Sequence, residues 1–210
     1  MTDQPETSRT RQAQRTVFST SRLEALSDGV FAIALTLLVL DLAVGTAARR
    51  HLLHALVELW PSYLAYVTSF FMIGLVWIGH HVIMSTSSGV DRRVVKINLA
   101  LLFVVAFLPF PTRLLGEFIR DPHAEQVAAV FYGTWLLLIS ITLAGMWRYV
   151  SGKHRLLPDD FSQATVDRFT RSFRPNIALY GFAIALAFIF PRIAAALFLI
   201  IAVAGFIRIA

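Results

Sequence analysis

Apolar residues in this chain form six long runs, and polar segments separate them. A helix that crosses a bilayer needs about 20 mostly apolar residues. The last two runs are short and are separated only by Pro191 and Arg192, so we expect them to form a tight helical hairpin. The pattern predicts an all-α integral membrane protein, with a polar tail over residues 1–20 and a six-helix transmembrane domain over residues 21–210. The predicted transmembrane helices are residues 23–44, 53–83, 94–115, 126–149, 176–190 and 193–209.

Prolines indicate where two of these runs start or break. The second run is too long for a perpendicular span, and Pro61 predicts either the start of its helix or a kink. Pro109 and Pro111 are expected to break the far end of the third run. Residues 151–175 form a polar, arginine-rich loop with interleaved phenylalanines. This pattern fits either an amphipathic helix on the inner leaflet or a solvated connecting helix.

The composition supports a membrane protein and excludes several kinds of chemistry. The chain is 57% hydrophobic and 15% charged, whereas a soluble domain has about 25% charged residues. It has no cysteine, which excludes disulfides and zinc–thiolate sites. The net charge of +6 is compatible with nucleic-acid binding, but basic residues of membrane proteins collect in cytoplasmic loops. We therefore predict a lipid bilayer as the partner, and no nucleic acid.

The distribution of basic residues predicts the orientation. With six spans, both termini and the second and fourth loops lie on one side of the membrane. Five of the 19 lysines and arginines fall on the other side, namely Arg49, Arg50, Arg113, Arg120 and Arg192. Because the side with more basic residues is cytoplasmic, the bias predicts a multi-pass protein of the cell membrane with both termini in the cytoplasm.

Polar residues near the start of the first run are the strongest functional signal. Ionisable groups inside a spanning helix are costly and indicate a functional site. Asp28 lies about one and a half turns inside the predicted helix, close to Ser27 and Arg22. The structural alternative is that Ser27 or Asp28 caps the helix N-terminus.

The same helix carries an apolar stripe. At about 100° per residue, Leu26, Gly29, Ile33, Leu37 and Leu40 share one face, with Thr36 at its edge. Periodicity alone favours helix packing or a lipid-facing surface over pore lining for such a stripe.

Residues 22–41 resemble the signature first helix of the transmembrane protein 175 family, the endosomal and lysosomal potassium channels with bacterial and archaeal relatives. The family motif R-x-x-x-F-S-D is followed by G/A-x-x-A-I-x-x-T and V-x-E/D. Leu26 stands where the family has phenylalanine, which is a conservative departure. A Trp-x-x-His-His element in the second run also agrees. The matching positions are Arg22, Ser27, Asp28, Ile33, Thr36 and Asp41 in the first run and Trp77, His80 and His81 in the second.

The resemblance implies a homotetramer in which four copies of the first helix line a central pore for potassium ions. It assigns a hydrophobic constriction to Ile33, Leu37 and Leu40, and a contribution to selectivity to Thr36. The TVGYG sequence of carbonyl selectivity filters does not occur in this chain. No metal site and no cofactor beyond the permeant ion are expected. A polar cluster with a structural or gating role is assigned to Arg22, Ser27, Asp28, Trp77, His80 and His81.

Within this cluster, the topology places Asp28 and His80 in the same leaflet. His80 and His81 are therefore candidate partners of Asp28, and protonation of a histidine in such a contact would change its pairing and bias gating. The alternative is a histidine that is simply hydrogen-bonded at the membrane interface.

Other classes of protein remain as alternatives. An enzyme with haem or metal bound by histidines is disfavoured, because His80 and His81 point about 100° apart on a helix. The chain also has no H-E-x-x-H, G-x-S-x-G or phosphate-loop motif. A secondary transporter predicts inverted repeats and broken helices, neither of which is evident. A non-conducting membrane scaffold is the third alternative.

Overall fold

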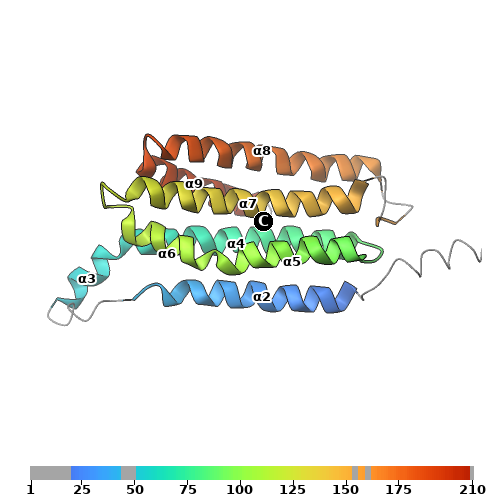
Figure 1. The fold of residues 1–210 in the computed structure, drawn as a ribbon, viewed down its shortest axis with the longest axis horizontal. Helices are drawn as coiled ribbons and strands as arrows, with labels where there is room; N and C mark the ends of the chain where they lie inside the picture. The colour runs from blue at the N-terminus through green and yellow to red at the C-terminus, as the bar shows by residue number, and fades with distance from the viewer. Residues whose placement is uncertain (1–19, 44–50, 153–155, 159–161, 209–210) are drawn as a thin grey trace, which may run out of the picture.

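The protein is a bundle of roughly parallel and antiparallel helices, seen here in a computed structural model (Figure 1). The structure describes residues 20–43, 51–152, 156–158 and 162–208. The predicted tail therefore lies almost wholly outside the described residues. The helices are α2 (Thr20–Leu40), α3 (Leu52–Glu58), α4 (Trp60–Thr86), α5 (Arg92–Phe107), α6 (Pro109–Phe118), α7 (Glu125–Ser151), α8 (Gln163–Ala187) and α9 (Pro191–Ile207).

The bundle has α2 at one edge and α8 at the other, with α4 to α7 between them (Figure 1). Helix α2 packs against α4, α5 and α6, whereas α8 packs against α7 and α9. The short helix α3 projects from the end of the bundle where α2 ends and α4 begins. We call this end the α3 end.

Four helical segments of the described residues are long and apolar enough to cross a membrane. Two shorter apolar helices follow, so the described residues give an all-helical structure with four candidate spans, and a count of six crossings stays a prediction. The four segments are Thr20–Leu40, Trp60–Thr86, Arg92–Phe118 and Glu125–Ser151, and the shorter ones are Asn176–Ala187 and Pro191–Ile207.

The prolines act where the sequence predicts. Pro61 lies in the first turn of α4 and separates it from α3, so it starts the helix rather than kinking it. Pro109 starts α6 and ends α5 at Phe107. Because proline has no N–H, the carbonyl oxygen of Val105 accepts a hydrogen bond from Leu108 N–H instead, at 3.1 Å, and the regular helical ladder is interrupted there.

The segment over residues 151–175, expected to contain an interfacial or connecting helix, is helical from Gln163 onward, but this helix is continuous with the fifth predicted span. One continuous helix, α8, runs from Gln163 to Ala187 and passes through Pro175. Packing of α8 along α7 and α9 accounts for this difference, because neighbouring helices in membrane proteins stabilise a helix across a proline.

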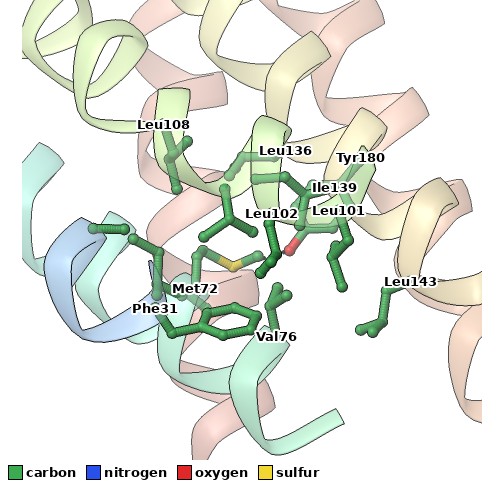
Figure 2. Close-up of a cluster of buried hydrophobic side chains, with 14 of the residues drawn as sticks. Phe31, Met72, Val76, Leu101, Leu102, Leu108, Leu136, Ile139, Leu143 and Tyr180 are labelled. Atoms are coloured by element: carbon green, nitrogen blue, oxygen red, sulfur yellow. Dashed lines mark hydrogen bonds between the residues drawn. The ribbon is translucent and has the colours of Figure 1, made fainter. Parts of the chain in front are cut away.

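The interior is apolar and closely packed. Figure 2 shows side chains of α2, α4, α5, α7 and α8 meeting in one cluster, among them Phe31, Met72 and Leu136. At the α3 end, a Cβ on Gly116 would lie 2.9 Å from the backbone of Ser62, so only glycine lets α6 approach α4 this closely. Small residues commonly allow such contacts between membrane helices.

Candidate functional site

Helix α2 has one buried face, which fixes it to the rest of the bundle. The residues of this face recur at helical spacing and pack against α4 and α5. The Phe31 ring lies 5.5 Å from the His80 ring, centroid to centroid. The buried residues are Leu23, Ser27, Phe31, Ala34 and Leu38.

The opposite face of α2 is apolar and exposed in the single chain. Ile33 is 59% exposed, Leu37 41% and Leu40 70%. Leu26 and Gly29 are exposed on the same side. The structure therefore gives the predicted stripe a common orientation away from α4 and α5. Among the described residues, no contact within the chain covers the large apolar side chains of this face.

Thr36 is exposed at the edge of this stripe. Its hydroxyl donates a hydrogen bond to the carbonyl oxygen of Ile33, at 2.9 Å. This bond uses the hydroxyl proton, so the lone pairs of the oxygen remain available on the exposed side. An oxygen in this state can accept a hydrogen bond from water or contact a cation.

A buried hydrogen-bond network joins α2, α4 and α5. Asn98 Nδ2 donates to Ser27 Oγ at 3.0 Å, and Ser27 Oγ donates to the carbonyl oxygen of Leu23 at 2.8 Å. His80 Nε2 lies 2.8 Å from Asn98 Oδ1. Because an amide oxygen only accepts, His80 must carry a proton on Nε2. We call Ser27, His80 and Asn98, all fully buried, the Asn98 network.

Nδ1 of His80 is buried and has no hydrogen-bond partner among the described residues. A second ring proton would therefore have no acceptor there, whereas the neutral tautomer leaves only an acceptor unpaired. The geometry fits a neutral His80 protonated on Nε2 alone.

Two further polar contacts join α2 to α4 nearer the surface of the chain. Trp77 Nε1 donates to Asp28 Oδ1 at 2.9 Å. His81 Nδ1 lies 3.1 Å from Glu24 Oε1. The Trp77 and His81 rings are stacked, with centroids 5.8 Å apart. Asp28 is thus held by tryptophan and not by the histidine predicted from sequence.

The predicted polar cluster is assembled except for Arg22. Ser27, Asp28, Trp77, His80 and His81 all lie at the α2–α4 contact, whereas Arg22 is exposed and has no hydrogen bond to the cluster among the described residues. Sequence reasoning missed two members, Asn98 and Glu24. The signal for Asn98 was present, since it is a polar residue inside an apolar run and such residues find partners within a membrane.

A cavity of about 720 Å³ lies at the α3 end, where α2 ends. Leu40 and Asp41 contribute to its wall, together with charged residues of α3 and α6. Burial raises the pKa of Asp41 above its ordinary value, although the positive charge of Arg113 opposes this rise. On the same wall, the hydrogen bond and the charge of Arg120 lower the pKa of Glu58. The end of the candidate stripe therefore opens toward a polar, charged cavity.

Among the described residues, no group of three or more histidine, aspartate or glutamate side chains has a geometry that could hold a metal ion. His80 and His81, the histidines considered as haem or metal ligands, have Asn98 and Glu24 as their polar partners.

Comparison with known proteins identifies relatives over most of the chain. Residues 22–109 match the family model described as endosomal/lysosomal potassium channel TMEM175. A protein of Chamaesiphon minutus, named potassium channel Cha6605_3372, is 42% identical over 173 residues, which are 81% of this chain and 85% of that protein. Potassium channel B446_29190 of Streptomyces collinus is 41% identical over 170 residues, covering 80% of this chain and 82% of that one.

The likeness extends to three dimensions. The crystal structure of a lysosomal potassium-selective channel TMEM175 homolog from Chamaesiphon minutus superposes with a TM-score of 0.81 and 37% identity, over 90% of this chain and 97% of that one. The chicken protein named endosomal/lysosomal proton channel TMEM175 is 39% identical over 116 residues, which are 51% of this chain and 23% of that protein. Because these relatives are named as channels, the family is one of channels and not of enzymes. The chain belongs to the TMEM175 family and is a multi-pass, all-helical membrane protein of the ion-channel class.

Proposed function

We propose that this protein is a potassium-preferring channel in which four copies of α2 line a central pore without a TVGYG filter. The observation that carries the proposal is the exposed stripe formed by Ile33, Leu37 and Leu40 on a helix whose other face is locked into the bundle. The prokaryotic relatives that match most of the chain are named potassium channels, which supports the choice of ion.

The family resemblance and the exposed stripe on α2 support a homotetramer. A single α2 at the edge of the bundle cannot enclose a pore, so its exposed face needs further copies around an axis. The proposed arrangement has both termini in the cytoplasm of a cell-membrane protein, with the apolar part of α8 and α9 as the fifth and sixth crossings. In this orientation the α3 end faces the outside of the cell.

The constriction would close by dewetting. Rings of four isoleucine or leucine side chains make a narrow apolar neck in which water and dissolved ions are unstable. Ile33, Leu37 and Leu40 follow each other at helical spacing, so each would form one ring. A modest rotation or splaying of the four helices would then open the neck.

Selectivity would come from partial dehydration assisted by Thr36. Potassium loses water more cheaply than sodium, which favours potassium at a site with weak ligands. The Thr36 oxygen, with its proton donated to the helix backbone, can face the ion as a ligand. Four hydroxyls select less strongly than a carbonyl cage, so we expect weaker discrimination than in TVGYG channels.

The polar cluster would set the rotation of α2 about its own axis. Its hydrogen bonds reach both α4 and α5 from the segment just before the stripe. A shift in these bonds would turn the stripe relative to the pore axis, so we assign the cluster a structural and gating role.

The decisive experiment is reconstitution of the protein in liposomes with potassium, sodium and proton flux measured separately. Ile33→Asn should raise potassium flux about tenfold or more and reduce the preference over sodium, because a polar ring keeps the neck wet. Val39→Asn is the matched control, since Val39 is also exposed on α2 but lies outside the stripe.

Equal flux in wild type and Ile33→Asn would contradict a constriction at Ile33. Unitary current steps in a planar bilayer distinguish the channel from a secondary transporter. A reconstituted wild-type protein that passes no ion under any condition tested would favour the scaffold. Proton flux without potassium flux would favour the activity for which the chicken relative is named.

A further inference from the structure

A second cavity, which shares Pro61 and Arg120 with the first cavity, opens at the α3 end between α4, α6 and α9. Its volume is about 390 Å³, within the range of about 300–1,000 Å³ that is typical of small-molecule sites. The lining is apolar apart from two arginines and Thr68. The Thr68 hydroxyl donates to the carbonyl oxygen of Leu64 in its own helix, at 2.7 Å. Its proton is therefore already hydrogen-bonded and needs no partner in the cavity.

The cavity has a polar rim and an apolar interior. Arg120 follows α6 by two residues and Arg192 is the second residue of α9, so both guanidinium groups belong to the rim. From this rim the lining continues along the helices to Thr68 in α4 and Leu199 in α9. At 1.5 Å per residue, the apolar part reaches about 10 Å into the bundle.

Trp60 places this rim at the boundary between hydrocarbon and water. It lines the cavity at the first residue of α4 and is 49% exposed. Tryptophans at the ends of membrane helices typically lie at head-group level. Arg120 and Arg192 would therefore lie among head groups, and the apolar interior of the cavity would lie beside acyl chains.

Both arginines are available for a further ligand. Arg120 Nη1 donates to Glu58 at 2.6 Å, and Arg192 Nε donates to Glu125 at 2.6 Å. Their side chains are still 52% and 62% exposed. A guanidinium group has five N–H donors, so the bond to glutamate leaves donors that can bind phosphate oxygens.

We propose that this cavity is a phospholipid site, which holds one acyl chain between α4, α6 and α9 and the phosphodiester between Arg120 and Arg192. The small side chains of Ala195 and Ala196 leave the space for the chain. The rim at head-group level and its two arginines fit the phosphate of an amphipathic molecule. The apolar interior of the cavity fits its acyl chain. The site depends only on the placement of the bundle in a membrane and not on ion conduction.

The paired glutamates define what the site recognises. Because Glu58 and Glu125 balance the two arginines, the rim carries little net charge. Recognition then rests on hydrogen bonds to the phosphodiester and on burial of the chain. We expect phosphatidylglycerol and phosphatidylethanolamine to bind with similar affinity, and dioleoylglycerol, which lacks the phosphate, to bind much more weakly.

The test is lipid binding to the purified, delipidated full-length protein, followed by native mass spectrometry during titration with each defined lipid. We expect one tightly held phospholipid per chain. Arg120→Gln combined with Arg192→Gln should weaken binding about tenfold or more, because two charge-assisted hydrogen bonds are lost. Ala196→Phe should weaken it to a similar extent by filling the cavity while both arginines remain, and Ala195→Leu provides a milder filling variant.

Two variants serve as matched controls. Arg113→Gln removes an exposed arginine of α6 that does not line this cavity, and Ala178→Phe enlarges an exposed alanine of α8. Both should bind lipid like wild type. Binding that is unchanged in the arginine and filling variants, or equally weakened in the controls, would overturn the proposal. Equal binding of dioleoylglycerol, or of glycerol phosphate without acyl chains, would also overturn it.

Discussion

The two halves of α2 are held by different forces. The first half, residues 20–31, contains Ser27 and Asp28, whose hydrogen bonds reach α5 and α4. The second half, residues 32–40, is buried only through Ala34 and Leu38 and exposes Ile33, Leu37 and Leu40. The first half is therefore held in place by hydrogen bonds, and the second half is held by apolar packing on a single face.

This difference shows how the direction of an apolar stripe on a membrane helix can be fixed. Lipid is as apolar as leucine, so hydrophobicity alone does not decide which side of a membrane helix faces its neighbours. Hydrogen bonds have fixed directions and fix the rotation of the first half. Because α2 is one continuous helix, the rotation of the first half also sets the direction of the stripe in the second.

The largest expected effect comes from breaking the Asn98 network. Asn98→Leu removes the partner of His80 and the donor to Ser27, so two buried polar groups lose a hydrogen bond. We expect a loss of about 2–3 kcal/mol in the free energy of unfolding, measured by chemical denaturation in detergent. Asn176→Leu, at an exposed position of α8, is the control and should change little. Equal destabilisation by both changes would refute a special role for the network.

The apolar half is tested by a pair of adjacent leucines. Leu38 is fully buried, whereas Leu37 is 41% exposed. Leu38→Ala should destabilise the protein by about 1–2 kcal/mol, because in an apolar solvent mainly the cavity contributes. Leu37→Ala should leave stability nearly unchanged but increase potassium flux by widening the neck. Thermal unfolding and liposome flux measured on both variants test these two expectations. A larger loss of stability in Leu37→Ala than in Leu38→Ala would contradict the assigned faces.

A smaller effect is expected at the contact nearer the surface of the chain. Trp77→Phe keeps an aromatic ring but removes the N–H that binds Asp28. We expect a loss of about 1 kcal/mol in the free energy of unfolding, since the bond is charge-assisted but exposed. Trp60→Phe is the control, because Trp60 lies on the same helix with similar exposure. If both variants unfold at the same denaturant concentration as wild type, the bond does not stabilise α2.

The smallest effect concerns pH at the α3 end. Burial raises the pKa of Asp41, so on acidification this carboxylate becomes neutral at a higher pH than an ordinary aspartate. Its negative charge concentrates cations near the end of the stripe. Potassium current should therefore fall by about twofold as the pH on that side drops through the raised pKa. Planar-bilayer recordings of Asp41→Asn should show the lower current at all pH values, and an unaltered pH response in that variant would assign the effect to another group.

Much of the molecule could be predicted from the sequence. Run length and composition were sufficient for the spanning helices, because a bilayer demands long apolar segments whatever their neighbours are. Pro61 was expected at a helix start or a kink and Pro109 at a break in the third span, and both positions were marked by the sequence because the missing N–H acts locally. The sequence did not show that residues 163–175 and the fifth span form one helix, because the packing of α8 on α7 and α9 acts between segments far apart in the chain.

The sequence by itself determined the membrane class, the long apolar helical segments and the stripe of Ile33, Leu37 and Leu40 on one face of α2. All of these depend on local composition and on the helical repeat. Only the tertiary structure decided which groups meet: Asp28 with Trp77, His80 with Asn98, and Glu24 with His81. Partner choice depends on the relative rotation and depth of α2, α4 and α5, which is set by packing between segments far apart in the chain.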